Sequence, residues 1–212
     1  MTKVVDENYK IGSEILTKIE GKAVFDLLNE LNFVSKELSE FIVSFAYGQV
    51  FPLPHLDLKT KELLILAMLL AKENAEPQLK VHLKSALNTG NSFNEIQDLI
   101  TIFSNLNNID KPLSFIDFIE EQKHLVPFET KNLDELLMTR NRYLIEIAIL
   151  STLGNQTDSL ISKIKEALKF GITQEEINEV MLLLIPYCGF PNAINGTLIL
   201  KQTLQEMSIE NR

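Results

Sequence analysis

Apolar residues recur every three or four positions over most of the chain, which is the spacing of amphipathic helices. In residues 6–47 this pattern predicts a run of helices, and Gly21 is expected to separate the first two. Residues 48–57 contain two prolines and are predicted to form an extended loop. No segment alternates apolar and polar residues between turn residues in the manner of a strand. The pattern therefore predicts an all-α fold.

The chain contains an internal duplication with an offset of 81 positions, which aligns Gly90 with Gly171. Eleven of the 45 aligned pairs between residues 59–103 and residues 140–184 are identical, and eight further pairs join two different apolar residues. The most informative difference is at His82, whose counterpart is Lys163. A duplicated unit in which only one copy has the histidine is consistent with chemistry in one copy and a structural role for the other.

Each repeat is predicted to contain three helices. The first helix covers about residues 60–72 and 141–153, and the second covers residues 77–88 and 158–169. Gly90 and Gly171 are placed to end the second helix in a left-handed conformation, and Gly154 to cap the first helix of the second copy. The third helix begins at capping boxes, Ser92 with Glu95 and Thr173 with Glu176.

The end of the chain and the domain limits follow from the same pattern. Pro186 is expected to kink or end the third helix of the second copy, because proline removes a backbone hydrogen bond and clashes with the preceding turn. A last helix is predicted over residues 192–207. We divide the chain into an N-terminal helical segment (residues 1–46), a first repeat (residues 47–125) and a second repeat (residues 126–212), with the two repeats packed as one compact unit.

Composition and charge narrow the classes of function. The chain is long enough to bury a core without metal or disulfide support, and 45% of its residues are hydrophobic. The formal net charge of −9 argues against nucleic acid and anionic membrane as partners, since both require clustered lysine and arginine. No apolar run has the ~20 residues that span a bilayer, and the first residues lack the apolar centre of a signal peptide, so a cytoplasmic protein is expected. The single cysteine, Cys188, excludes an intrachain disulfide and a cysteine-rich metal site.

Several short motifs, in this order and spacing, resemble the carboxymuconolactone decarboxylase family. The motifs are Lys61-Glu62-Leu63, Gln78-Leu79-x-x-His82, Ala86-Leu87-x-x-Gly90, Glu95-Ile96 and Tyr187-Cys-Gly-Phe-Pro-Asn-Ala193. The resemblance implies an all-helical AhpD-like bundle that assembles into rings. A chain with two copies resembles a fused dimer, so a homotrimer would form a ring of six units. It also implies a small-molecule substrate.

The family has two chemical branches, and the sequence departs from one of them. The decarboxylases act without a cofactor, whereas the AhpD-like peroxidases use a Cys-x-x-Cys pair upstream of a histidine. Counted back from His82, the two cysteine positions are Ala75 and Gln78. Thiol peroxidation needs an attacking thiolate and a resolving partner, and a lone Cys188 does not supply that pair. The family's histidine corresponds to His82, and its glutamate corresponds to Glu62.

His82 and Glu62 are the predicted catalytic residues. His82 falls on or beside the apolar stripe of its helix, where poor hydration favours the neutral imidazole that acid–base chemistry requires. The alternative is a core histidine that makes one hydrogen bond. Glu62 is near the start of its helix, where the helix dipole favours a carboxylate in any case. If the first two helices pair in antiparallel fashion, Glu62 could orient the imidazole.

Substrate binding is assigned to Arg140, Arg142 and Tyr187. Guanidinium groups bind carboxylates through two hydrogen bonds, although such residues often belong to solvated faces. Cys188 is interpreted as a packing residue. The leading hypothesis is a lactone decarboxylase that needs neither cofactor nor metal. The alternatives are a peroxidase relative with a degenerate redox site and a non-catalytic oligomer that binds a ligand.

Overall fold

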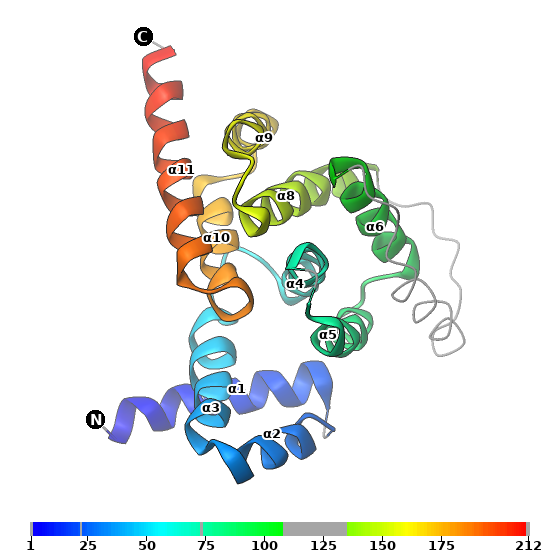
Figure 1. Cartoon of the computed structure of the whole chain (residues 1–212), viewed down its shortest axis with the longest axis vertical. Helices are drawn as coiled ribbons and strands as arrows, with labels where there is room; N and C mark the ends of the chain where they lie inside the picture. Colours follow the sequence, from blue (N-terminus) through cyan, green and yellow to red (C-terminus); the bar gives the residue numbers. More distant parts are fainter. Residues whose placement is uncertain (1, 22, 73, 108–134, 211–212) are drawn as a thin grey trace. The chain divides into compact units, whose positions relative to one another are not determined.

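The structure is a computed structural model that describes residues 2–21, 23–72, 74–107 and 135–210. Every regular element in these ranges is a helix, which confirms the predicted all-α fold (Figure 1). The chain separates into two compact units, Met1–Leu58 and Lys59–Arg212. The predicted boundary between the repeats, after residue 125, lies outside the described residues.

The N-terminal unit consists of α1 (Thr2–Glu20), α2 (Ala23–Val34), α3 (Lys36–Phe41) and the π-helix η1 (Ile42–Val50). Gly21 ends α1 with a φ of 70°, as expected for a residue that separates two helices. The predicted loop over residues 48–57 is wrong at its start, because Gly48 to Val50 belong to η1. Tertiary packing extends this helix, since Val43, Ala46, Tyr47 and Val50 are all buried.

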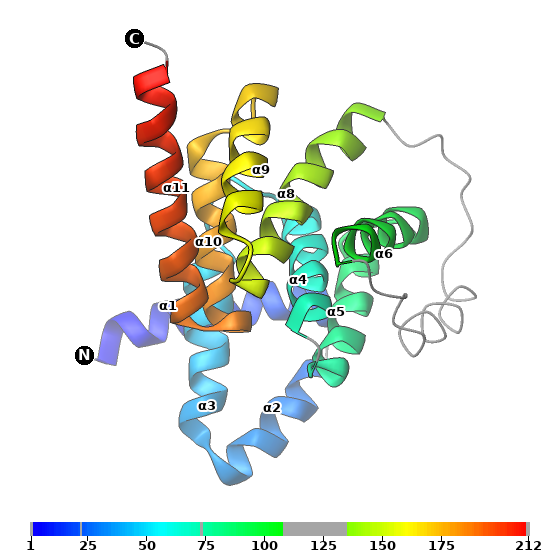
Figure 2. The ribbon, with the colours of Figure 1, turned by 45° about the horizontal axis from the view of Figure 1, so that its top comes forward.

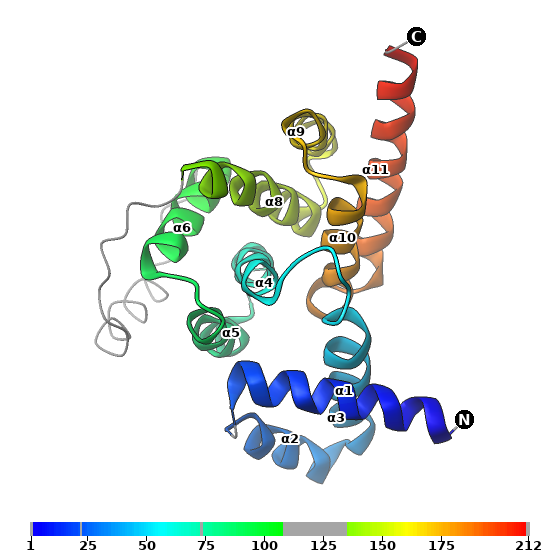
Figure 3. The same ribbon diagram turned by 180° about the vertical axis from the view of Figure 1, so that it is seen from behind.

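Two glycines allow α1 and η1 to cross with their backbones in contact (Figure 3). A Cβ atom on Gly12 would overlap the carbonyl oxygen of Val43, and one on Gly48 would overlap the carbonyl oxygen of Asn8. Neither obstacle is the flexible end of a side chain. The absence of side chains at these two positions is therefore a condition of the crossing.

The C-terminal unit contains the three helices predicted for each repeat and the last helix. The helices are α4 (Leu58–Lys72), α5 (Glu76–Asn88) and α6 (Phe93–Asn107) in the first, α8 (Glu135–Leu153), α9 (Thr157–Phe170) and α10 (Gln174–Cys188) in the second, and α11 (Phe190–Glu210) at the end. The predicted helices are confirmed, with α8 beginning six residues earlier than expected. Both capping boxes are formed, and Gly90, Gly154 and Gly171 have positive φ at the expected helix ends.

Pro186 does not end the third helix of the second repeat at its own position. The helix α10 continues to Cys188 and stops at Gly189, which has a φ of 88°. A proline removes a single backbone hydrogen bond, and the helix closes its last turn through Gly189, whose N–H donates to the carbonyls of Leu184 and Ile185.

The first helix of each repeat forms the core of this unit. Residues 60–71 of α4 are all buried, as are residues 144–151 of α8. A helix that is apolar on every side requires neighbours all around it. The last helix, α11, packs against both α9 and α10 (Figure 2). Among the described helices, none combines the length and apolar character needed to cross a membrane.

Candidate active site

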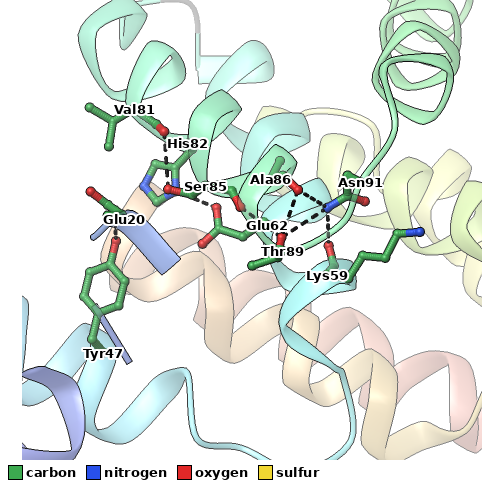
Figure 4. A network of polar contacts seen from close by, with 10 residues as sticks. All are labelled: Glu20, Tyr47, Lys59, Glu62, Val81, His82, Ser85, Ala86, Thr89 and Asn91. Atoms are coloured by element: carbon green, nitrogen blue, oxygen red, sulfur yellow. Dashed lines mark hydrogen bonds and ion pairs between the residues drawn. The ribbon is translucent and has the colours of Figure 1, made fainter. Parts of the chain in front are cut away.

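His82 and Glu62 form a buried pair between the first two helices of the first repeat. Glu62 belongs to the core helix α4 and is fully buried, and His82 on α5 is 5% exposed. The imidazole Nδ1 lies 2.9 Å from the carboxylate Oε2 of Glu62 (Figure 4). An ionised carboxylate only accepts hydrogen bonds, so it favours the tautomer with the proton on Nδ1 and leaves Nε2 outside this hydrogen bond. The contact predicted between these residues is present.

Local sequence explains why the two side chains meet. Pro77 lies in the first turn of α5, where its missing N–H removes no helical hydrogen bond. Gly90 turns the chain at the end of α5 with a φ of 96°. The carboxylate of Glu62 and the imidazole of His82 thus come from adjacent helices that are each fixed at their ends.

Asn91, which is not among the predicted site residues, joins the end of α5 to the start of α4. Its side chain is buried, and its Nδ2 donates to the carbonyl oxygen of Lys59 at 2.9 Å and to that of Ala86 at 3.1 Å (Figure 4). The counterpart of Asn91 in the second repeat is Ile172. A polar residue next to a helix-ending glycine in only one copy is the signal that identifies it.

Tyr187, on α10 of the second repeat, contacts His82. Its ring lies 5.1 Å from the imidazole of His82, centroid to centroid, at an interplanar angle of 85°. Aromatic rings favour this edge-to-face arrangement. The Nζ of Lys72 donates a hydrogen bond of 2.8 Å to the carbonyl oxygen of Tyr187. The immediate surroundings of the imidazole are therefore assembled from α4, α5 and α10, which belong to both repeats.

The sequence of the chain is similar to that of known proteins. The model of the carboxymuconolactone decarboxylase family matches residues 36–104 and again residues 122–202. The chain is also 35% identical over 96 residues to the 4-carboxymuconolactone decarboxylase of Acinetobacter baylyi (strain ATCC 33305 / BD413 / ADP1), an alignment that covers 45% of this chain and 71% of that protein. The chain belongs to the carboxymuconolactone decarboxylase family. The two matched regions confirm that this family member is a tandem repeat with an AhpD-like fold.

Arg140 and Arg142 are bound to carboxylates of the second repeat in this family member. A guanidinium nitrogen of Arg140 donates to Glu176, the same residue that closes the capping box of α10. The Nε of Arg142 donates to Oε1 of Glu146 at 3.0 Å. Within the described residues, no hydrogen bond or ion pair joins either arginine to Glu62 or His82. A role for them in holding a substrate carboxylate stays a prediction.

The position equivalent to His82 is occupied by an ion pair in the second repeat. The Nζ of Lys163 lies 2.8 Å from Oε2 of Glu146 and 2.9 Å from Oε2 of Glu166, and 5.8 Å from the ring centre of Tyr143. Partial burial lowers the pKa of Lys163, but hydrogen bonds and charge attraction from Glu146 and Glu166 outweigh it, so its pKa is raised. This ammonium stays charged at neutral pH, and a base is not available at this position.

Cys188 has the character of a packing residue. Burial raises the pKa of its thiol, against the opposing effects of a contact with the Thr152 hydroxyl at 3.5 Å and of the charge on Lys72. A thiol with a raised pKa is a poor nucleophile at neutral pH. This agrees with the absence of cysteine at residues 75 and 78, the positions of the peroxidase pair in the family.

The structure also has hollows away from His82 and Glu62. Two lie on the N-terminal unit, with volumes of about 340 and 390 Å³. The first is lined from α1, α3 and η1, and the second from α1. Neither includes His82 or Glu62 in its lining, so an enclosed space for a substrate beside His82 stays a prediction.

Proposed function

We propose that this chain is a cofactor-free decarboxylase of a small carboxylated lactone, with His82 as the proton donor. The observation that supports this is the buried hydrogen bond between His82 Nδ1 and Glu62 Oε2. An imidazole whose Nδ1 is held by a buried carboxylate has a fixed ring orientation and a fixed tautomer. Membership of the family and the likeness to a 4-carboxymuconolactone decarboxylase supply the substrate class.

The reaction requires one bond cleavage and one proton transfer. The bond between the carboxylate carbon and the lactone carbon breaks, carbon dioxide leaves, and the electron pair conjugates into the ring carbonyl. The imidazolium of His82 then gives its Nε2 proton to carbon, and solvent restores that proton. The carboxylate of Glu62 offsets the imidazolium charge. The chain thus supplies an oriented acid in a water-poor position, which general acid catalysis requires.

The test is decarboxylation of 4-carboxymuconolactone by His82→Gln and Glu62→Gln variants. Loss of the acid is expected to lower kcat by about 10²- to 10⁴-fold, and the Glu62 variant is expected to lower it less, because the imidazole remains. The matched control is Lys163→Gln, which changes the equivalent position in the second repeat and is expected to keep kcat. Circular dichroism spectra check that each variant is folded.

The outcomes separate the alternatives. Unchanged turnover in His82→Gln removes His82 from the mechanism. No turnover by the natural chain, together with ligand binding that depends on His82, favours a non-catalytic binding protein. Hydroperoxide reduction that survives Cys188→Ser identifies a redox chemistry that does not use the thiol. The raised pKa of the Cys188 thiol is an argument against a peroxidase.

We also propose that the chain forms a homo-oligomer, for which a trimer is the predicted form. Three large apolar side chains lie on one face of α11 at intervals of four residues and are more than half exposed: Phe190, Ile194 and Leu198. We call these residues the α11 stripe. A contiguous exposed apolar surface of this kind favours association, and the expected occupant is a second copy of the chain. The molar mass in solution, measured by light scattering, tests this.

A further inference from the structure

The carbonyl oxygen of Tyr187 lies where the chain cannot complete a helical hydrogen bond. The residue four positions later is Pro191, which has no N–H to donate. Carbonyl groups in the last turn of a helix carry partial negative charge and need partners from elsewhere. Here the donor is the ammonium group of Lys72, at 2.8 Å. Lys72 is the last residue of α4, so this contact joins the end of the core helix of the first repeat to the end of α10 in the second.

The same residue, Tyr187, is in contact with the imidazole. Its ring meets that of His82 edge to face at 5.1 Å. The main chain of Tyr187 is therefore held by Lys72 while its side chain packs against His82. A shift of the end of α10 would move the ring relative to the imidazole, and Lys72 opposes that shift.

The residues near His82 can be compared with those at the equivalent positions of the other repeat. The helices α6 (Phe93–Asn107) and α10 (Gln174–Cys188) keep the offset of 81 positions at both ends, so the register extends to Tyr187. His82, its neighbours Glu62 and Tyr187, and Lys72 all differ from their counterparts in the other repeat, which are Lys163, Tyr143, Leu106 and Leu153.

One ion pair, in contrast, occurs at equivalent positions in both repeats. Lys59 binds the capping-box residue Glu95 at 2.8 Å, and its counterpart Arg140 binds the capping-box residue Glu176. This contact joins the first helix to the third in each repeat. The contacts from Lys72 to Tyr187 and from Tyr187 to His82 have no counterpart in the other repeat, where the equivalent residues are Leu153, Leu106 and Lys163.

We propose that Lys72 is a positioning residue for His82 and acts through Tyr187. Its hydrogen bond to the Tyr187 carbonyl fixes the end of α10, and this keeps the ring of Tyr187 against the imidazole. The expected effect on turnover rests on the proposed decarboxylase function. The expected effect on the position of the imidazole does not.

The first measurement is the proton NMR signal of the His82 imidazole, which is shifted by the ring current of the adjacent Tyr187. The chain has three histidines, so the His82 signal is assigned by its loss in His82→Gln. Tyr187→Leu removes the ring and gives the unshifted position, whereas Tyr187→Phe keeps the ring. Lys72→Met is expected to move the signal toward the Tyr187→Leu position. Lys72→Arg, which still has a donor, is expected to restore it.

The second measurement is kcat for lactone decarboxylation. Lys72→Met is expected to lower kcat about three- to tenfold with KM little changed, the effect of losing one hydrogen bond from a charged donor. The matched control is Lys201→Met, which removes an exposed positive charge on α11. An unmoved His82 signal in Lys72→Met overturns the proposal. A moved signal without decarboxylation by the natural chain supports the positioning role and overturns the proposed function instead.

Discussion

A buried ion pair between Lys61 and Glu179 connects the two repeats and permits a quantitative prediction. The Nζ of Lys61 lies 2.8 Å from Oε1 of Glu179, and the side chains are 1% and 2% exposed. Lys61 belongs to α4 in the first repeat and Glu179 to α10 in the second. The perturbation is Lys61→Met, which keeps an apolar stem of similar length and removes the charge.

The magnitude follows from two opposing effects. At 2.8 Å and an effective dielectric constant of about 20, the attraction between unit charges is about 6 kcal/mol. Removing each ion from water costs several kcal/mol, so the pair has a small net effect on stability. Loss of one partner leaves the desolvation cost of the other. Lys61→Met is therefore expected to lower the free energy of unfolding by about 3–5 kcal/mol, whereas Lys61→Met combined with Glu179→Leu recovers most of that loss.

Urea unfolding followed by far-ultraviolet circular dichroism measures these values, because the chain has no tryptophan for fluorescence. The control is Lys36→Met, which breaks the exposed pair of Lys36 and Glu40 and should change stability by less than about 1 kcal/mol. The reasoning is refuted if Lys61→Met costs no more than this control. It is also refuted if the effects of the two substitutions simply add in the double variant.

Three further predictions concern other parts of the molecule. Gly12→Ala forces a Cβ against the carbonyl oxygen of Val43 and should lower the stability of the N-terminal unit by about 1–3 kcal/mol. An unchanged melting temperature would contradict the close crossing of α1 and η1. Burial, and to a smaller extent the charge of Glu95, raises the pKa of the Asp98 carboxyl, so protein stability falls as pH rises through the folded-state pKa of this group. Asp98→Asn should therefore raise Tm at neutral pH. The gain in Tm should vanish below pH 3.8, the ordinary pKa of this carboxyl. Ile194→Glu places a charge in the α11 stripe and should lower the molar mass measured by light scattering, whereas an unchanged mass would locate the oligomer contact elsewhere.

The sequence by itself determined the features that depend on neighbours along the chain. Apolar periodicity identified the helices, and the glycine and capping-box signals located their ends to within a few residues. The duplication was visible because both copies must bury the same faces. His82 and Glu62 were found through their place in family motifs, and an antiparallel pair of helices was enough to bring them together.

The tertiary structure decided which distant groups meet, because residues far apart in the chain carry no local signal of their contact. Arg140 and Arg142, expected to hold substrate, are bound to Glu176 and Glu146. Lys72 and Tyr187 are 115 positions apart, and their contact depends on how the ends of α4 and α10 approach. The π-helix η1 replaced the first residues of a predicted loop, since packing against α1 outweighs local propensity there. Sequence therefore specified the helices and the pair of His82 and Glu62, and packing specified the neighbours of that pair.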